Sequence, residues 1–99
     1  MPFKLRFSAS AARTLKVLED SDPSKLWKVR RAFARLEQNP RYPGLASHQY
    51  ESFPADRHVK VWDSYVESRT PSARRIFWRY GPNDGEVAVI TVLAIGPHP

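Results

Sequence analysis

The chain begins with apolar and polar residues in strict alternation. Phe3, Leu5 and Phe7 are separated by Lys4 and Arg6. Because successive side chains of a β-strand point to opposite faces, this spacing predicts a short first strand with one buried face. After Phe7 the apolar residues no longer alternate with polar ones, so the strand is expected to end there.

Two segments with helical periodicity follow. The first has Ser8 where an N-cap is wanted, and its apolar residues recur at helical spacing up to Glu19. The second starts at Asp22, which precedes a proline, and ends at Asn39, which precedes another. One face of the second segment is apolar: Leu26, Val29, Phe33 and Leu36. Because few polar residues join the two segments, they predict a helical hairpin.

The second half of the chain has the patterns of strands and turns. Residues 41–57 are rich in Pro, Gly, Ser and His, which indicates a loop with a short edge strand near Tyr50 to Phe53. Three further segments are bounded by turn residues and predict strands: 59–66, 74–80 and 87–95. Asn83 to Gly85 predicts the turn between the last two. The order indicates an α+β fold, a short strand and a helical hairpin before a three- to four-stranded, mainly antiparallel sheet, in one domain spanning 1–99.

The strand predicted at 74–80 carries the clearest chemistry. Alternation places Arg75, Phe77 and Arg79 on one face, which we call the open face, and the apolar or aromatic residues between them on the other. The next strand is apolar throughout, which is typical of a central strand, and it leads towards His98. Guanidinium groups, an aromatic ring and an imidazole near one end of a sheet are suited to binding RNA phosphates.

Composition and charge limit the classes of function. Sixteen Lys and Arg against ten Asp and Glu give a net charge of +6, which favours a polyanionic partner such as nucleic acid or an acidic protein. There is no cysteine, and the three His residues lack helical pairing, so neither a metal nor a cofactor is expected. The longest apolar run is too short to cross a bilayer, and the N-terminus lacks a signal peptide's apolar region. We therefore expect a cytoplasmic protein without membrane contact.

The order of elements resembles that of the RelE/ParE superfamily of bacterial type II toxins. Two short motifs support the resemblance, the Arg-Ile-Phe-Trp run from Arg75 to Trp78 and the Ile-Gly-Pro-His run from Ile95 to His98. The resemblance covers nearly the whole chain in element order. It implies either a RelE-like toxin that enters the ribosomal A site and cleaves mRNA or a ParE-like toxin that poisons DNA gyrase. Both kinds are neutralised by a cognate antitoxin.

The resemblance to RelE-like toxins also implies roles for particular residues. In such cleavage the substrate's own 2′-hydroxyl attacks the phosphorus, so the protein supplies a base, positive charge and an acid. Arg75 corresponds to the family's phosphate-binding arginine, and Arg74 and Arg79 would extend the cationic track to RNA. His98 corresponds to a C-terminal general acid. Relatives usually continue past this histidine with acidic residues and a tyrosine, whereas only Pro99 follows it here. This difference from the relatives argues for a non-catalytic role.

The general base depends on the register of the strand predicted at 59–66. One register places a basic residue and an aromatic platform for RNA on the open face: His58, Lys60 and Trp62. The register shifted by one residue places a carboxylate and a phenol there instead: Asp63 and Tyr65. We favour the first register, because its basic side chains would join Arg75, and we keep Tyr65 as an alternative catalytic residue. His48 is expected to be a surface residue.

The leading hypothesis is a toxin of a type II toxin-antitoxin system that acts as a ribosome-dependent mRNA endonuclease by metal-free transesterification. Its expected partners are a cognate antitoxin, the ribosome and mRNA, with DNA reached only through the antitoxin. Two alternatives stay open, a ParE-like gyrase-directed toxin and a catalytically inactive relative that only binds antitoxin. The basic residues of the second helix are expected to form a solvated face.

Overall fold

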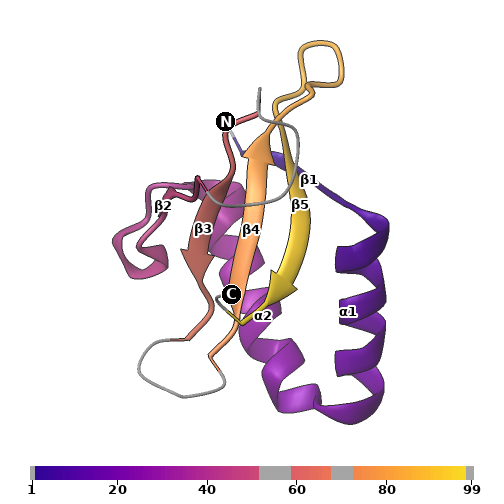
Figure 1. Cartoon of the computed structure of the whole chain (residues 1–99). Helices are drawn as coiled ribbons and strands as arrows, with labels where there is room; N and C mark the ends of the chain where they lie inside the picture. The colour runs from indigo at the N-terminus through magenta and orange to yellow at the C-terminus, as the bar shows by residue number, and fades with distance from the viewer. Residues whose placement is uncertain (1, 52–58, 68–72, 98–99) are drawn as a thin grey trace.

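The structure is a computed structural model that describes residues 2–51, 59–67 and 73–97. In chain order its elements are β1 (Lys4–Phe7), α1 (Ala9–Ser21), α2 (Pro23–Gln38), the 3₁₀ turn η1 (Pro43–Leu45), β2 (His48–Gln49), β3 (Trp62–Tyr65), β4 (Arg75–Tyr80) and β5 (Val89–Gly96). Among the described residues the strands form one five-stranded sheet in the order β1-β5-β4-β3-β2. Figure 1 shows α2 passing behind the sheet and α1 beside it, next to β5. The expected α+β fold is confirmed.

The sheet is mixed and contains more strands than expected. β1 pairs in parallel with β5, whereas the other neighbouring strands are antiparallel. A parallel pair needs a long connection, and here most of the chain separates the two strands. The prediction of three to four strands was wrong in number because the first strand joins the sheet at its edge.

Two side-chain caps shape the helical hairpin. The Ser8 hydroxyl accepts a hydrogen bond from the Ala11 N–H at 3.0 Å and donates to the Leu93 carbonyl at 2.6 Å, which ties the start of α1 to β5. Asp22 separates the two helices, and its carboxylate accepts from the Lys25 N–H at 3.1 Å. The predicted hairpin is therefore confirmed, with α1 ending at Ser21 rather than Glu19.

The core lies between the helices and the helix-side face of the sheet. Its buried members come from α1, α2, η1, β4 and β5: Ala11, Leu18, Leu26, Val29, Ala32, Phe33, Leu36, Leu45, Ile76, Trp78, Ile90, Val92 and Ile95. The helical periodicity predicted the apolar face of α2, and all four of its residues are in this cluster. Ile76 and Trp78 face the helices as the alternation in β4 predicted.

Strand ends differ from the predicted ones by a few residues. The edge strand is His48–Gln49 rather than the segment near Tyr50 to Phe53, the second half of which lies outside the described residues. The predicted turn between β4 and β5 is present, and Gly85 there has a φ of +58°, a conformation that favours glycine. In the described part of the chain, no helix combines the length and apolar character that crossing a membrane requires.

Candidate active site

The register of β3 decides which side chains share the open face with Arg75. Trp62 pairs with Trp78, Asp63 with Phe77 and Tyr65 with Arg75. Asp63 and Tyr65 therefore share a face with Arg75, and the register that we favoured from the sequence is wrong. The physical reason is burial, because the Trp62 ring stacks on the Trp78 ring on the helix side, with centroids 5.9 Å apart.

An ion pair between Asp63 and Arg75 forms the centre of the site. Asp63 is fully buried, and its Oδ1 accepts a hydrogen bond from Arg75 Nε at 2.8 Å. A buried carboxylate is costly without a partner, so this contact holds both side chains in place. The guanidinium also lies over the Tyr65 ring, 3.8 Å from its centroid.

The position of Arg75 suits phosphate binding. The Arg75 side chain keeps 14% of its surface exposed. Of the N–H groups of Arg75, the one on Nε donates to Asp63. Among the described residues, no hydrogen bond from its two terminal nitrogens is seen, and these carry the N–H groups that match phosphate oxygens. The buried acid and the aromatic ring therefore preorganise a cation at the surface.

His48 lies beside this ion pair. Its Nε2 is 3.6 Å from Asp63 Oδ2, its Nδ1 is 3.0 Å from the Ala46 carbonyl oxygen, and its ring meets the Tyr65 ring edge-on. His48 was expected to be a surface residue, and its side chain is 47% exposed. Its place beside Asp63 was missed because only the pairing of β2 with β3 brings the two residues together. A carboxylate next to an imidazole can orient it for proton transfer.

The other residues predicted for the site are dispersed. Arg79 follows Arg75 on the open face, and its Nε–H donates to the Tyr80 carbonyl at 3.2 Å. Arg74 is half-buried and directly precedes β4, whereas Lys60 is exposed and precedes β3. His58 and His98 lie outside the described residues.

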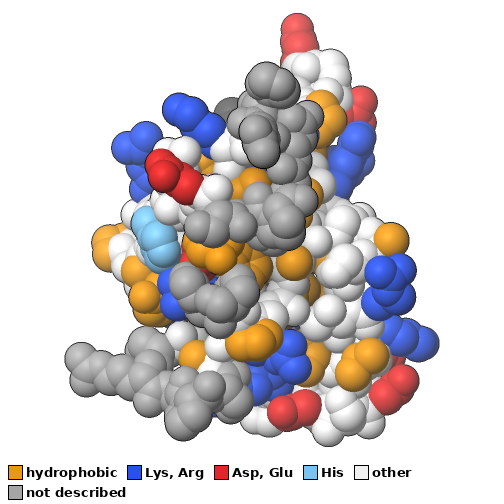
Figure 2. Space-filling model, viewed as in Figure 1, with side chains coloured by type: hydrophobic (Ala, Val, Ile, Leu, Met, Phe, Trp, Pro, Cys, Tyr) orange, Lys and Arg blue, Asp and Glu red, His pale blue; other side chains and the backbone are white. Residues whose placement is uncertain are grey.

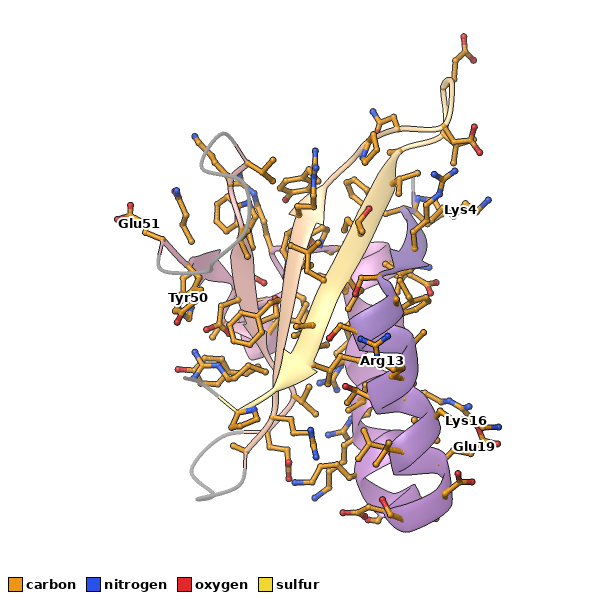
Figure 3. The ribbon with its side chains drawn as sticks, turned by 45° about the vertical axis from the view of Figure 1, so that its right-hand side comes forward. Lys4, Arg13, Lys16, Glu19, Tyr50 and Glu51 are labelled. Carbon is orange, nitrogen blue, oxygen red and sulfur yellow. The ribbon has the colours of Figure 1, made fainter. Side chains whose placement is uncertain are left out.

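Tyr50 covers another part of the open face. Its ring contacts the Phe77 ring, with centroids 5.3 Å apart, and Phe77 is buried beneath it. Figure 3 shows Tyr50 and Glu51 at the side of the sheet away from α1. Figure 2, which views the open face, shows Lys and Arg side chains around its rim. No cluster of three potential metal ligands is found within the described residues.

A second ionic contact connects the segment that follows β3 to α2. The Glu67 carboxylate, with 10% of its side chain exposed, binds Lys25 Nζ and, at 3.2 Å, Lys28 Nζ. The hydrogen bond from Lys25 is the main reason that the pKa of Glu67 lies below its ordinary value. This contact fixes the strand segment that carries Tyr65 relative to α2.

Solved structures with this arrangement of elements include bacterial toxins. A YoeB/ParE toxin from Agrobacterium tumefaciens is similar, with a TM-score of 0.74 and 14% identity over 98% of this chain and 100% of that one. The YoeB dimer from Staphylococcus aureus has a TM-score of 0.70 and 13% identity over 100% of both chains. The heterotetrameric YoeB-YefM toxin-antitoxin complex from Staphylococcus aureus contains a chain with a TM-score of 0.68 and 11% identity, again over 100% of both. No protein-family model and no curated protein sequence matches the chain.

These similarities concern the fold, because the sequences share only 11–14% identity. They extend over nearly the whole chain and include the N-terminal strand, the helical hairpin and the sheet. The expected fold is thus confirmed, and the chain shares the fold of these YoeB and YoeB/ParE toxins.

Proposed function

We propose that this protein is the toxin of a type II toxin-antitoxin system and that it cleaves mRNA on the ribosome. The observation that carries the proposal is Arg75, held by the buried Asp63 and stacked on Tyr65, with the His48 imidazole near the same carboxylate. The net charge of +6 fits a polyanionic substrate. The fold shared with YoeB toxins supports the same role.

The proposed reaction is a transesterification within the RNA. The 2′-oxygen forms a bond to the adjacent phosphorus, and the bond from phosphorus to the 5′-oxygen breaks, leaving a 2′,3′-cyclic phosphate. With Nδ1–H donating to the Ala46 carbonyl, His48 accepts the proton of the 2′-hydroxyl at Nε2, and Asp63, whose Oδ2 is 3.6 Å from Nε2, stabilises the imidazolium that results. The terminal N–H groups of Arg75 bind the phosphate oxygens as negative charge develops on them. His98 remains the proposed acid for the 5′-oxygen, and Tyr65, which shares the open face with Arg75, remains the alternative base.

Single-turnover cleavage on translating ribosomes tests this proposal. Arg75→Lys keeps a cation beside Asp63 but loses the planar fork, so we expect cleavage to fall about tenfold to a hundredfold while ribosome binding changes little. Arg13→Lys is the matched control, because Arg13 is exposed on α1 and has no assigned role in RNA binding, and it should cleave at nearly the wild-type rate. Mapping of mRNA 5′ ends after induction would show the cut sites, and an intact mRNA pool during growth arrest would refute the nuclease role.

An antitoxin is the proposed partner. A groove between α1 and α2 is lined by apolar side chains that include Leu15, Leu26 and Phe33. Its charged lining residues are two cations and one carboxylate: Lys16, Arg30 and Glu19. Charged side chains of α1 project into solvent along this helix in Figure 3. An amphipathic acidic segment would place apolar residues in the groove and carboxylates against the cations. Failure of the protein to bind the product of an adjacent gene would count against this partner.

A gyrase-directed toxin is the second candidate, favoured by the outer face of α2. Trp27 is 60% exposed there, and the Arg31 guanidinium lies 5.0 Å from its ring centroid. Exposed tryptophan and arginine are common at protein interfaces. Inhibition of gyrase supercoiling by the purified protein, lost in Trp27→Ala, would favour this candidate over the nuclease.

A further inference from the structure

An aromatic hollow lies on the helix side of the sheet, between β3, β4 and the loop that carries η1. Its volume is about 420 Å³, and its lining includes four aromatic rings and a guanidinium: Tyr42, Trp62, Trp78, Tyr80 and Arg41. Tyr80 meets both tryptophans edge-on, with ring centroids 4.9 Å from Trp78 and 6.2 Å from Trp62. This volume is in the range of sites for small organic ligands.

Hydrogen bonds fix one wall of the aromatic hollow. Trp78 is almost fully buried, and its Nε1–H donates to Ser64 Oγ at 2.8 Å. The Ser64 hydroxyl lies 2.6 Å from Ser47 Oγ, which donates to the Pro40 carbonyl at 2.8 Å. If each hydroxyl donates onward, every member of this chain is satisfied, and β4, β3 and the loop after α2 are joined. The hollow is therefore preformed.

The rings at the mouth of the hollow are accessible. Tyr42 and Tyr80 keep 39% and 43% of their surface exposed, and Trp62 is half-buried. Several large aromatic side chains left partly exposed around one hollow indicate a binding site rather than a core. Such rings offer flat faces on which another planar ring can stack.

Charge distinguishes between the ligands that aromatic hollows bind. Arg41 lines the hollow, and the Arg35 guanidinium lies 4.9 Å from the Tyr42 ring centroid. The described lining residues include no carboxylate. Aromatic cages also bind quaternary ammonium groups, but two arginines would repel such a cation. A planar ligand that carries negative charge fits better.

We propose that the aromatic hollow binds a nucleobase of a nucleotide or of single-stranded RNA, with its phosphate near Arg41. The base would stack on the exposed rings of Tyr42 and Tyr80. Ser47 lines this hollow while the next residue, His48, pairs with Asp63 on the open face. The hollow is thus separate from the candidate active site, and base binding can be measured whether or not the protein cleaves mRNA.

Gly44 provides a sensitive variant of the hollow. A Cβ atom at Gly44 would lie 2.8 Å from Cε1 of Tyr42, closer than such contacts allow. Because the Tyr42 side chain is partly exposed and can move, Gly44→Ala should displace the ring without unfolding the protein. Gly44→Ala therefore tests the position of the Tyr42 ring, whereas Tyr42→Ala removes that ring.

NMR of the indole N–H groups tests the proposal on the intact chain. The tryptophans give separate signals, and titration with 5′-AMP, 5′-UMP and a trinucleotide of RNA should shift that of Trp62 but not that of Trp27. Ribose 5-phosphate carries the phosphate without a base and should leave the Trp62 signal in place. Tyr42→Ala and Gly44→Ala should each weaken 5′-AMP binding about tenfold, and Trp27→Ala should leave it unchanged.

Three results would overturn the inference. The first is an unchanged Trp62 signal at millimolar nucleotide and trinucleotide. The second is an equal response to ribose 5-phosphate, which would show binding of phosphate alone. The third is a response to tetramethylammonium or to a proline-rich peptide in place of nucleotides, which would assign the hollow to a cation or to a protein partner. Stronger binding of the trinucleotide than of 5′-AMP would identify RNA rather than a free nucleotide as the ligand.

Discussion

Asp63 Oδ1 lies 2.8 Å from Arg75 Nε, and Asp63 itself has no exposed surface. The arginine best placed to bind a phosphate is therefore also the partner of a buried acid. Stability and the proposed chemistry consequently depend on the same contact, and the two effects must be separated in any mutational test.

A double-mutant cycle should reveal this contact as an energetic coupling. Asp63→Ala or Arg75→Ala alone should each lower the free energy of unfolding by about 3–5 kcal/mol, because each removes the 2.8 Å ion pair that compensates a poorly exposed charge. The double variant should lose less than the sum of the two, with urea unfolding as the measurement. Losses that add to within about 0.5 kcal/mol would show that the pair is not coupled.

His48 should carry one limb of the pH dependence of cleavage. If it accepts the 2′-hydroxyl proton, His48→Ala should slow single-turnover cleavage by about 10²–10⁴-fold and remove the decline in rate at acidic pH. His98→Ala should instead affect the alkaline limb. Circular dichroism of both variants checks the fold. An unchanged pH profile in His48→Ala would transfer the role of base to Tyr65.

Glu67 should make the protein sensitive to acid. Its pKa is lowered in the folded state by Lys25 and Lys28, so the unfolded chain binds more protons between the folded and unfolded pKa values. The stabilisation is therefore complete above the unfolded value, about 4.3, and is lost as the pH falls through the folded value. Glu67→Gln should cost about 1–3 kcal/mol at neutral pH and flatten this acid dependence.

The measurement for Glu67 is urea unfolding at a series of pH values. Glu86→Gln is the matched control, because Glu86 is exposed between β4 and β5 and its replacement should leave the slope unchanged. Equal slopes for wild type and Glu67→Gln would mean that the ion pair with Lys25 does not form in solution.

Phe33 should be essential for folding. It is buried in the core and its ring contacts Phe7, so Phe33→Ala should cost about 3–5 kcal/mol, a large part of the stability of a domain of this size. Trp27→Ala removes a larger ring from the exposed side of the same helix and should cost less than about 1 kcal/mol. Thermal unfolding of the two variants measures the difference, and similar losses would contradict the assigned orientation of α2.

Much of the fold was predictable because its causes are local. The caps at Ser8 and Asp22 and the helical spacing of apolar residues predict the hairpin, since a helix satisfies its own backbone within a few residues. The alternation in β4 likewise predicted that Arg75 and Trp78 lie on opposite faces. These features depend on residues that are close in the chain.

Only the tertiary structure decided the register of β3 and the position of His48. Alternation is equally consistent with two registers, and the choice between them depends on the stacking of Trp62 on Trp78 from another strand. His48 reaches Asp63 through strand pairing across a loop, and β1 joins β5 from the opposite end of the chain. The sequence thus determined the elements and the arginine of the site. The positions of the Asp63 carboxylate at that arginine and of the His48 imidazole near Asp63 depend on contacts between distant segments, which no local pattern encodes.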